Sequence, residues 1–141
     1  MARPIMVAVG GDSGTGKATL CEGLRAIFGD ARCTEVRLDG YLSLNRAERN
    51  AVGMTALDPR AHDFAAMDED LSALARGMAI TKPVYDHLRG AIASTETVEP
   101  AEIVLVQGLF PLYTRVLRSL FDLAVWLEPD AALKERWMIH R

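Results

Sequence analysis

A glycine-rich loop near the N-terminus has the residue types and spacing that bind phosphate groups. It follows the apolar run Ile5–Val9 and leads into a helix-forming stretch, the order that a phosphate-binding loop requires. Gly14 and Gly16 let the backbone curl so that successive N–H groups point at phosphate oxygens. Lys17 is placed to reach the β- and γ-phosphates. The predicted nucleotide-binding residues are Gly11, Asp12, Ser13, Gly14, Thr15, Gly16, Lys17, Ala18 and Thr19.

The residue after Lys17 departs from this pattern. That position ordinarily holds Ser or Thr, whose hydroxyl binds Mg²⁺, whereas Ala18 has no oxygen to offer. Thr19 could replace the hydroxyl only if the helix start shifted, since one step along a helix rotates a side chain by about 100°. The loop therefore predicts ATP binding with weakened Mg²⁺ binding. The alternative is a glycine-rich turn followed by a surface lysine.

Two further residues stand where phosphate chemistry would need them. Asp39 ends a predicted strand and can face the γ-phosphate, the place of a general base in a small-molecule kinase. The alternative is an aspartate that caps a turn before Gly40. Gln107 ends another strand, where P-loop enzymes usually carry an acidic residue for Mg²⁺. Its amide oxygen can accept a hydrogen bond from metal-bound water but brings no negative charge, so Gln107 is a doubtful metal residue.

Basic and aromatic side chains supply candidates for binding a phosphorylated substrate. The guanidinium groups of Arg46 and Arg60 match phosphate oxygens, although a solvated surface is the alternative for each. Pro83 favours an extended segment that places Lys82, Tyr85 and His87 on alternating faces. A single histidine is more often structural than functional.

The elements that would position these residues follow from the hydrophobic pattern. Continuous apolar runs predict strands buried on both faces over Ile5–Val9, Ile103–Val106 and Leu123–Leu127, with a half-polar strand over Thr34–Leu38. Helices are predicted over Lys17–Phe28, Leu44–Val52, Ala65–Arg76 and, after an Asp130 N-cap, Leu133–Arg141. Residues 78–100 predict an irregular or hairpin excursion. This order predicts an α/β, P-loop NTPase-like three-layer sandwich with a mainly parallel central sheet.

Composition limits the classes of partner. The chain has 141 residues and a net charge of −3, from 16 Lys and Arg against 19 Asp and Glu. This balance disfavours a nucleic-acid-binding protein, which needs a basic face. No apolar run reaches the length of a membrane span, and the N-terminus shows no signal-peptide pattern. Cys21 and Cys33 have neither CxxC nor metal-ligand spacing, so a cytoplasmic protein with reduced thiols is expected.

Taken together, these segments resemble the phosphoribulokinase branch of the phosphoribulokinase/uridine kinase family. The resemblance is most specific in residues 55–64, TALDPRAHDF, and continues in 82–87, KPVYDH, and 108–113, GLFPLY. Residues 38–41, LDGY, with Asn45 and Arg46, match imperfectly. Uridine kinases share the phosphate-binding loop and a Pro-Val-Tyr-Asp stretch, but not the segment 55–60.

The resemblance implies transfer of the γ-phosphate of ATP to the C1 hydroxyl of ribulose 5-phosphate, giving ribulose 1,5-bisphosphate. It implies that Asp39 is the catalytic base and that Lys17 acts on the phosphates. Sugar-phosphate binding is implied at or near Arg46, Lys82, Tyr85 and His87, with Arg60 a weaker candidate. The family also implies a homodimer, and its regulatory cysteines would correspond to Thr15 and Arg37, neither of which is Cys.

Departures from the family cluster at the chemistry. Ala18 and Gln107 replace residues that assist the metal, Leu42 and Phe110 stand where His is usual, and Gly40 replaces a second Asp. Three hypotheses therefore stay open: a phosphoribulokinase-type enzyme, a kinase-like protein that binds nucleotide or sugar phosphate with little turnover, and a uridine kinase. Because family members are considerably longer, the chain is also expected to correspond to their N-terminal part only.

Overall fold

The computed structural model describes residues 3–139, in which strands and helices alternate along most of the chain. The strands are β1 (Ile5–Gly11), β2 (Cys33–Arg37), β3 (Ile80–Asp86), β4 (Ala91–Val98), β5 (Ile103–Gly108) and β6 (Leu123–Leu127). The helices are α1 (Lys17–Phe28), α2 (Arg46–Ala51), α3 (Phe64–Ala75), α4 (Arg115–Leu120) and α5 (Ala131–Ile139). Short 3₁₀ segments are η1 (Asp30–Arg32), η2 (Leu38–Tyr41) and η3 (Pro59–Ala61).

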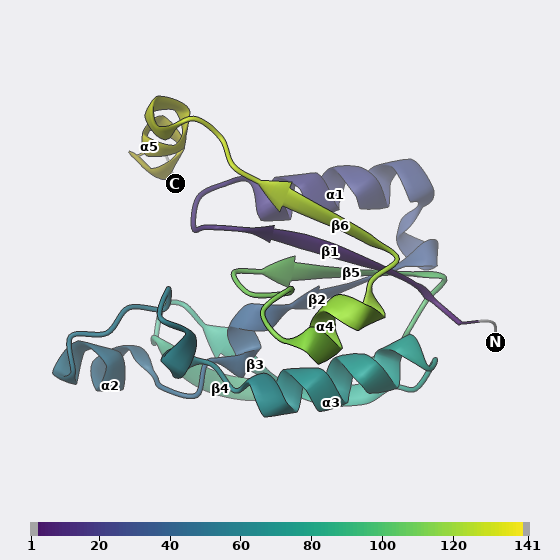
Figure 1. Cartoon of the computed structure of the whole chain (residues 1–141), viewed down its shortest axis with the longest axis horizontal. Coiled ribbons are helices and arrows are strands. Elements are labelled where there is room, and N and C mark those ends of the chain that lie inside the picture. The colour runs from purple at the N-terminus through teal and green to yellow at the C-terminus, as the bar shows by residue number, and fades with distance from the viewer. Residues whose placement is uncertain (1–2, 140–141) are drawn as a thin grey trace.

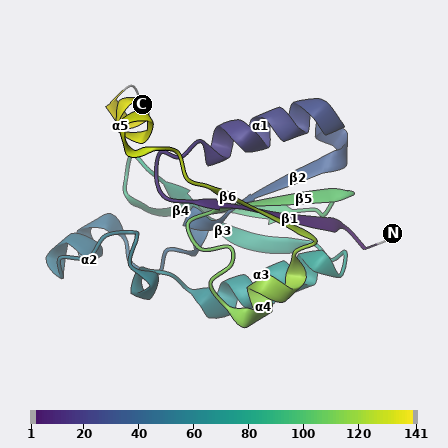
Figure 2. The ribbon, with the colours of Figure 1, turned by 45° about the horizontal axis from the view of Figure 1, so that its top comes forward.

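A four-stranded parallel sheet lies at the centre, in the order β2-β5-β1-β6. Helix α1 covers one face, and α3 and α4 cover the other (Figures 1 and 2). The β3-β4 pair forms a separate antiparallel hairpin beside α3. The predicted three-layer α/β fold with a parallel central sheet is confirmed, and residues 78–100 are a hairpin.

Two apolar clusters hold the layers together because alternate side chains of each strand point to opposite faces. Toward α1, the cluster contains Val7, Val9, Cys21, Cys33, Ile103 and Leu105. Toward α3, it contains Met6, Val36, Met67, Leu71, Leu74, Val104, Val106 and Leu117, among others. Both faces of β1 and β5 are therefore buried, as their continuous apolar sequences predict.

The prediction that Leu123–Leu127 is fully buried is wrong. Strand β6 is the edge of the sheet and pairs only with β1. Leu123 is 57% exposed and Trp126 is 53% exposed. An apolar run alone does not distinguish an edge strand from a central one, because coverage depends on which elements pack on each face.

Helix α1 has the predicted boundaries, whereas those of α2 and α3 differ from the predicted ones by one or two residues. Helix α2 begins at Arg46 instead of Leu44 because Asn45 forms a capping box with Glu48: the Glu48 amide donates to the Asn45 side chain and the Asn45 amide to the Glu48 carboxylate. Asp130 caps α5 as predicted, accepting from the Leu133 amide at 2.9 Å. The predicted end of that helix, residues 140–141, lies outside the described residues. No helix in residues 3–139 is long and apolar enough to span a membrane.

Leu71 tests the packing of α3 on the sheet. Its side chain has no exposed surface, so Leu71→Ala leaves a cavity and is expected to lower the free energy of unfolding by about 2–5 kcal/mol. Leu88→Ala is the matched control because Leu88 is 94% exposed, and its effect should stay within about 0.5 kcal/mol. Urea unfolding followed by circular dichroism measures both. Equal effects would contradict the described core.

Candidate active site

The glycine-rich loop joins β1 to α1 and curls as predicted. Gly14 and Gly16 have φ values of 74° and 91°, a region that favours glycine. Helix α1 begins at Lys17, and the Lys17 Nζ donates to the carbonyl oxygens of Gly11 at 2.8 Å and Asp12 at 2.7 Å. The Thr15 hydroxyl donates to the Asp12 carbonyl at 2.8 Å. The carbonyl oxygens at the start of the loop therefore bind the ammonium group of Lys17.

Ala18 and Thr19 occupy the first turn of α1. Because the helix begins at Lys17 without a shift, Thr19 does not take the place of the missing hydroxyl. A cavity of about 240 Å³ opens beside the loop, and Ala18 lines it together with Ser13, Gly14 and Lys17, whereas Thr19 is not among its lining residues. The loop thus presents a phosphate-sized site whose helix turn carries no side-chain oxygen at residue 18.

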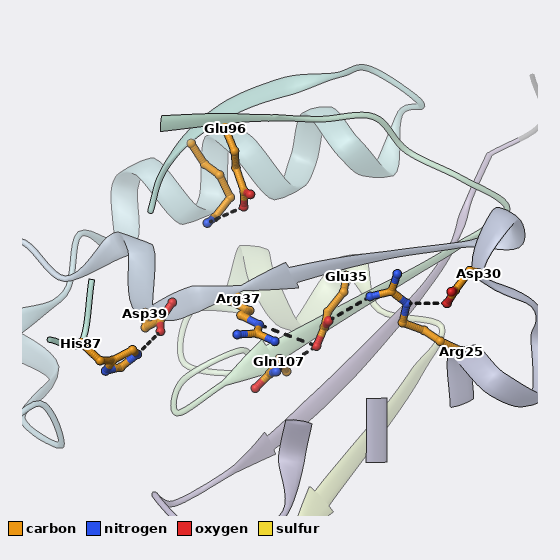
Figure 3. Close-up of polar contacts among 9 residues, drawn as sticks. Arg25, Asp30, Glu35, Arg37, Asp39, His87, Glu96 and Gln107 are labelled. Atoms are coloured by element: carbon orange, nitrogen blue, oxygen red, sulfur yellow. Dashed lines mark hydrogen bonds and ion pairs between the residues drawn. The ribbon is translucent and has the colours of Figure 1, made fainter. Parts of the chain in front are cut away.

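Asp39 lies in η2, two residues beyond Arg37 at the end of β2, and not in the strand itself. An Asp39 carboxylate oxygen lies 2.7 Å from His87 Nε2 (Figure 3). Asp39 and His87 both line the cavity beside the phosphate-binding loop. The pair joins two segments 48 residues apart in the chain, and it places a hydrogen-bonded carboxylate on the cavity that Lys17 also lines.

Gly40, next to Asp39, is required by close packing. A Cβ at this position would lie 2.0 Å from the Pro83 carbonyl oxygen and 2.9 Å from Lys82 Nζ. The hairpin therefore occupies the space that a second aspartate would need. The departure at Gly40 follows from the way β3 packs against η2.

A second groove, of about 480 Å³, lies between β2 and the hairpin. Its lining includes Lys82, Tyr85 and His87, three of the predicted substrate residues. Strict alternation of side chains along β3 would put Lys82 and Tyr85 on opposite faces of the hairpin. Both are nevertheless buried, and the pairing register of the hairpin shifts between Val84 and Tyr85, which breaks the alternation. Asp39 and His87 line this groove as well as the cavity at the loop. The two spaces therefore share a wall at the Asp39–His87 pair.

The two predicted substrate arginines lie outside both linings. Arg46 donates from its guanidinium to the His87 carbonyl at 2.6 Å, which braces the turn that carries His87. Arg60 forms an ion pair with Asp58 at 2.7 Å and is largely exposed. This hydrogen bond lowers the pKa of Asp58 to about 2. In the described structure Arg46 is next to the site, and Arg60 is not brought to it.

Lys82 and Tyr85 already have partners. The Lys82 side chain is only 2% exposed, and its Nζ donates to the Pro83 carbonyl at 2.9 Å and to Glu96 at 3.3 Å. Arg49 donates to the Tyr85 hydroxyl at 3.2 Å. Arg49 is buried although the charged sequence of α2 predicts an exposed helix. The Arg49 guanidinium also lies 5.9 Å from the centroid of the Tyr85 ring, so it contacts Tyr85 through both the hydroxyl and the ring.

His62 is a cavity-lining residue that the sequence did not single out. Its Nε2 lies 2.7 Å from the Ala56 carbonyl, so this nitrogen carries the proton and donates. Nδ1 is buried without a hydrogen-bond partner among the described residues. The Phe110 ring packs edge-on against it, with 5.0 Å between ring centroids. Only the folded chain reveals such an acceptor, since the sequence shows merely a lone histidine.

Gln107 is the penultimate residue of β5 and lines the cavity at the loop. Its Nε2 donates to the Glu35 carboxylate at 2.9 Å (Figure 3). Glu35 lies on β2, which pairs with β5 so that Arg37 is opposite Gln107. Glu35 was not predicted because strand alternation alone does not tell which polar residue faces a neighbouring strand's end.

The residues on the cavity suit a metal that arrives with its nucleotide better than a metal bound by the protein alone. Within residues 3–139 no group of three or more His, Cys, Asp or Glu side chains has a metal-binding arrangement. The lining side chains that carry oxygen are Ser13, Asp39 and Gln107. Mg²⁺ commonly keeps several waters and takes few protein ligands beside substrate phosphates, and this set fits that mode.

The cysteines have no visible role in this chemistry. Cys21 and Cys33 are both buried and both free. Burial raises the pKa of Cys21 to about 11, so its thiol stays protonated and unreactive. The expected reduced state is consistent with their place in the α1 cluster.

Comparison with known proteins agrees with this geometry. The sequence model of the phosphoribulokinase/uridine kinase family matches residues 6–141. The chain belongs to this family. It is 42% identical over 139 residues to a phosphoribulokinase of Synechocystis sp., covering 99% of this chain and 42% of that protein. It is 30% identical to a uridine kinase of Clostridium perfringens, covering 95% of this chain and 66% of the relative.

Solved structures show the same fold. A phosphoribulokinase structure from Rhodobacter spheroides superposes with a TM-score of 0.70 at 18% identity, covering 99% of this chain and 56% of the other. The chain spans less than half the length of the Synechocystis relative.

His62 also predicts a pH dependence of stability. Burial lowers its pKa below the ordinary 6.5, so below pH 6.5 the unfolded chain binds the proton before the folded chain does. Stability conferred by neutral His62 is therefore complete above pH 6.5 and is lost as the pH falls toward the lower pKa of the folded state. We expect His62→Gln to lose less stability than the unmodified chain between about pH 7 and about pH 5.

Urea unfolding at both pH values measures this difference. His87→Gln is the control, because His87 is 71% exposed and has no comparable burial. A parallel pH response of the unmodified chain and His62→Gln would contradict the burial of a neutral His62.

Proposed function

We propose that this chain is the nucleotide- and acceptor-binding part of an ATP-dependent kinase of the phosphoribulokinase type. The observation that carries the proposal is the shared wall at Asp39 and His87. On one side of it lies the cavity of the phosphate-binding loop, and on the other lies the groove lined by Lys82 and Tyr85. A carboxylate at this boundary can reach a hydroxyl of an acceptor that approaches the γ-phosphate of ATP.

Each residue has a stated task in this mechanism. The loop N–H groups and Lys17 bind the β- and γ-phosphates and stabilise the charge that shifts toward the leaving oxygen. Asp39 accepts the proton of the acceptor hydroxyl as that oxygen bonds to the γ-phosphorus and the bond to the ADP oxygen breaks. His87 holds the Asp39 carboxylate in place through their 2.7 Å contact.

Mg²⁺ bound to ATP would neutralise phosphate charge. Asp39 and Gln107 are the side chains that would hold it, through bound water in the case of Gln107. Ala18 adds no ligand, so we expect weaker dependence on the metal than in a kinase with a hydroxyl residue at that position.

The acceptor is proposed to be a pentose phosphate, ribulose 5-phosphate in the first instance. Support comes from the 42% identity to a phosphoribulokinase, against 30% to a uridine kinase. Arg25, Arg37 and Lys82 on the second groove can donate to a phosphorylated acceptor, beside the carboxylates of Glu35, Asp39, Glu96 and Glu99. A cytoplasmic location and a homodimer stay predictions.

A second candidate is a kinase-like protein that binds these ligands with little turnover. Ala18 and the neutral Gln107 favour it, because losing metal assistance in the transition state costs several kcal/mol and hence powers of ten in rate.

Nucleotide binding is tested by thermal denaturation. ATP at about 100 times its Kd should raise the melting temperature by roughly 10 °C, since it stabilises the folded state by about 2.7 kcal/mol. Lys17→Ala should lose most of this shift because the phosphates lose their cation. Lys82→Met is the control, since Lys82 lies in the other groove. An unshifted melting temperature with ATP would exclude the nucleotide site.

Catalysis is tested by coupled ADP release with MgATP and either ribulose 5-phosphate or uridine. We expect turnover with the pentose phosphate, and Asp39→Asn should lower kcat by roughly 10²–10⁴ while the affinity for ATP measured in EDTA is kept. Asp130→Asn is the matched control, because it makes the same chemical change at a helix cap. ATP binding without turnover on either acceptor would favour the second candidate, and preference for uridine would assign the chain to the uridine kinases.

A further inference from the structure

We infer that Glu35 is a positioning residue for Gln107: its carboxylate binds the carboxamide nitrogen and so turns the carboxamide oxygen toward the phosphate cavity. The inference rests on the proposed function, since it assigns this oxygen to the water shell of Mg·ATP. It names a side chain on β2 that lies outside the lining of the phosphate cavity and has no task in the proposed mechanism.

The orientation of Gln107 follows from the chemistry of its partner. Carboxylate oxygens accept hydrogen bonds and cannot donate them, so the atom 2.9 Å from Glu35 must be the Gln107 nitrogen. The oxygen of the same planar group then lies on the other side (Figure 3). Gln107 lines the cavity at the loop, whereas Glu35 is outside that lining and lines the second groove together with Arg25 and Arg37. The Gln107 side chain thus reaches from the cavity lining to a carboxylate that lies outside it.

Glu35 is itself held firmly. Its side chain is 12% exposed, Arg25 donates to one carboxylate oxygen at 3.3 Å, and Arg37 lies 3.9 Å from the other. Arg25 also pairs with Asp30 at 3.1 Å (Figure 3). A carboxylate fixed on several sides can fix the group that donates to it.

This arrangement accounts for a glutamine where an acidic residue is usual. Both oxygens of a carboxylate are equivalent, so an acidic side chain needs no orientation, whereas a carboxamide presents an oxygen only if its nitrogen is held elsewhere. With Glu35 present, a glutamate at residue 107 would set two partly buried carboxylates against each other. The negative charge therefore lies one strand away, on β2, and the neutral amide faces the cavity.

Glu35→Val removes the acceptor and releases the carboxamide. The Kd of ATP is measured by calorimetry in Mg²⁺ and in EDTA. The ratio of the Kd in EDTA to the Kd in Mg²⁺ is the gain in ATP affinity due to the metal, called here the Mg²⁺ gain. In E35V this gain should fall roughly tenfold, the loss typical when a residue that orients a metal's ligand is removed, while the Kd in EDTA stays unchanged. The matched control is Glu102→Val, because Glu102 pairs with Arg32 at 2.6 Å on the exposed surface.

Rescue distinguishes positioning from a purely structural role. E35V/Q107E should regain or exceed the original Mg²⁺ gain, because a carboxylate needs no orienting partner. Q107E alone should lower the melting temperature of the ligand-free chain by roughly 3–6 °C, because it sets two carboxylates against each other. The melting temperature of E35V/Q107E should fall by less than the sum of the decreases in the two single variants.

An E35V protein that keeps the full Mg²⁺ gain, or a folded double variant that fails to regain it, would overturn the inference. A chain that binds ATP with no Mg²⁺ gain would overturn it and leave nucleotide binding in place. Absence of ATP binding would overturn the proposed function, and with it the role at the phosphates. The ligand-free melting temperatures would then still report whether residues 35 and 107 are coupled.

Discussion

The pairing of β5 with β1 on one side and β2 on the other holds the site together. Its register sets Val9 opposite Gln107 and Gly10 opposite Gly108, while Arg37 lies opposite Gln107 on the other side. Because all three strands are parallel, their carboxyl ends meet at one edge. The phosphate-binding loop follows β1, Asp39 follows β2 and Gln107 is the penultimate residue of β5. A slip of one residue in either pairing would send the end-of-strand side chains to the wrong face.

The hairpin adds what the central sheet lacks. It brings His87 to Asp39 and Lys82 and Tyr85 to the second groove, and its close approach to η2 leaves room only for glycine at residue 40. Buried cations in this region have hydrogen-bond acceptors: Lys82 donates to Glu96, and Arg49 donates to the Tyr85 hydroxyl. The Lys82–Glu96 ion pair fixes geometry more than it adds stability, because desolvation offsets much of its attraction. The acceptor side of the site is thus pre-organised by a segment outside the sheet.

Departures from the family pattern are connected in space. Gln107 bonds Glu35, and Glu35 lies near Arg37, which occupies the position expected for a regulatory cysteine. Phe110 packs its ring against His62, whose Nδ1 is left without a partner. Gly40 has no side chain to clash with the Pro83 carbonyl oxygen, which packs against it. Gln107, Phe110 and Gly40 therefore each contact a neighbour that accommodates the replacement, so at these positions packing and hydrogen bonding are consistent with the residue present.

The sequence by itself determined the parallel α/β fold, the phosphate-binding loop, the start of α1 and the candidate base, because these depend on local spacing: a strand, glycines, a lysine and a helix within one short segment. It also identified Asp130 as a cap for the same reason. Only the tertiary structure decided that β6 is an exposed edge, that Arg60 is bound by Asp58, and that Arg49, His62 and Glu35 lie at the site. These outcomes depend on contacts between segments distant in the chain, where coverage, register and hydrogen-bond partners are fixed by the whole fold and leave no local pattern.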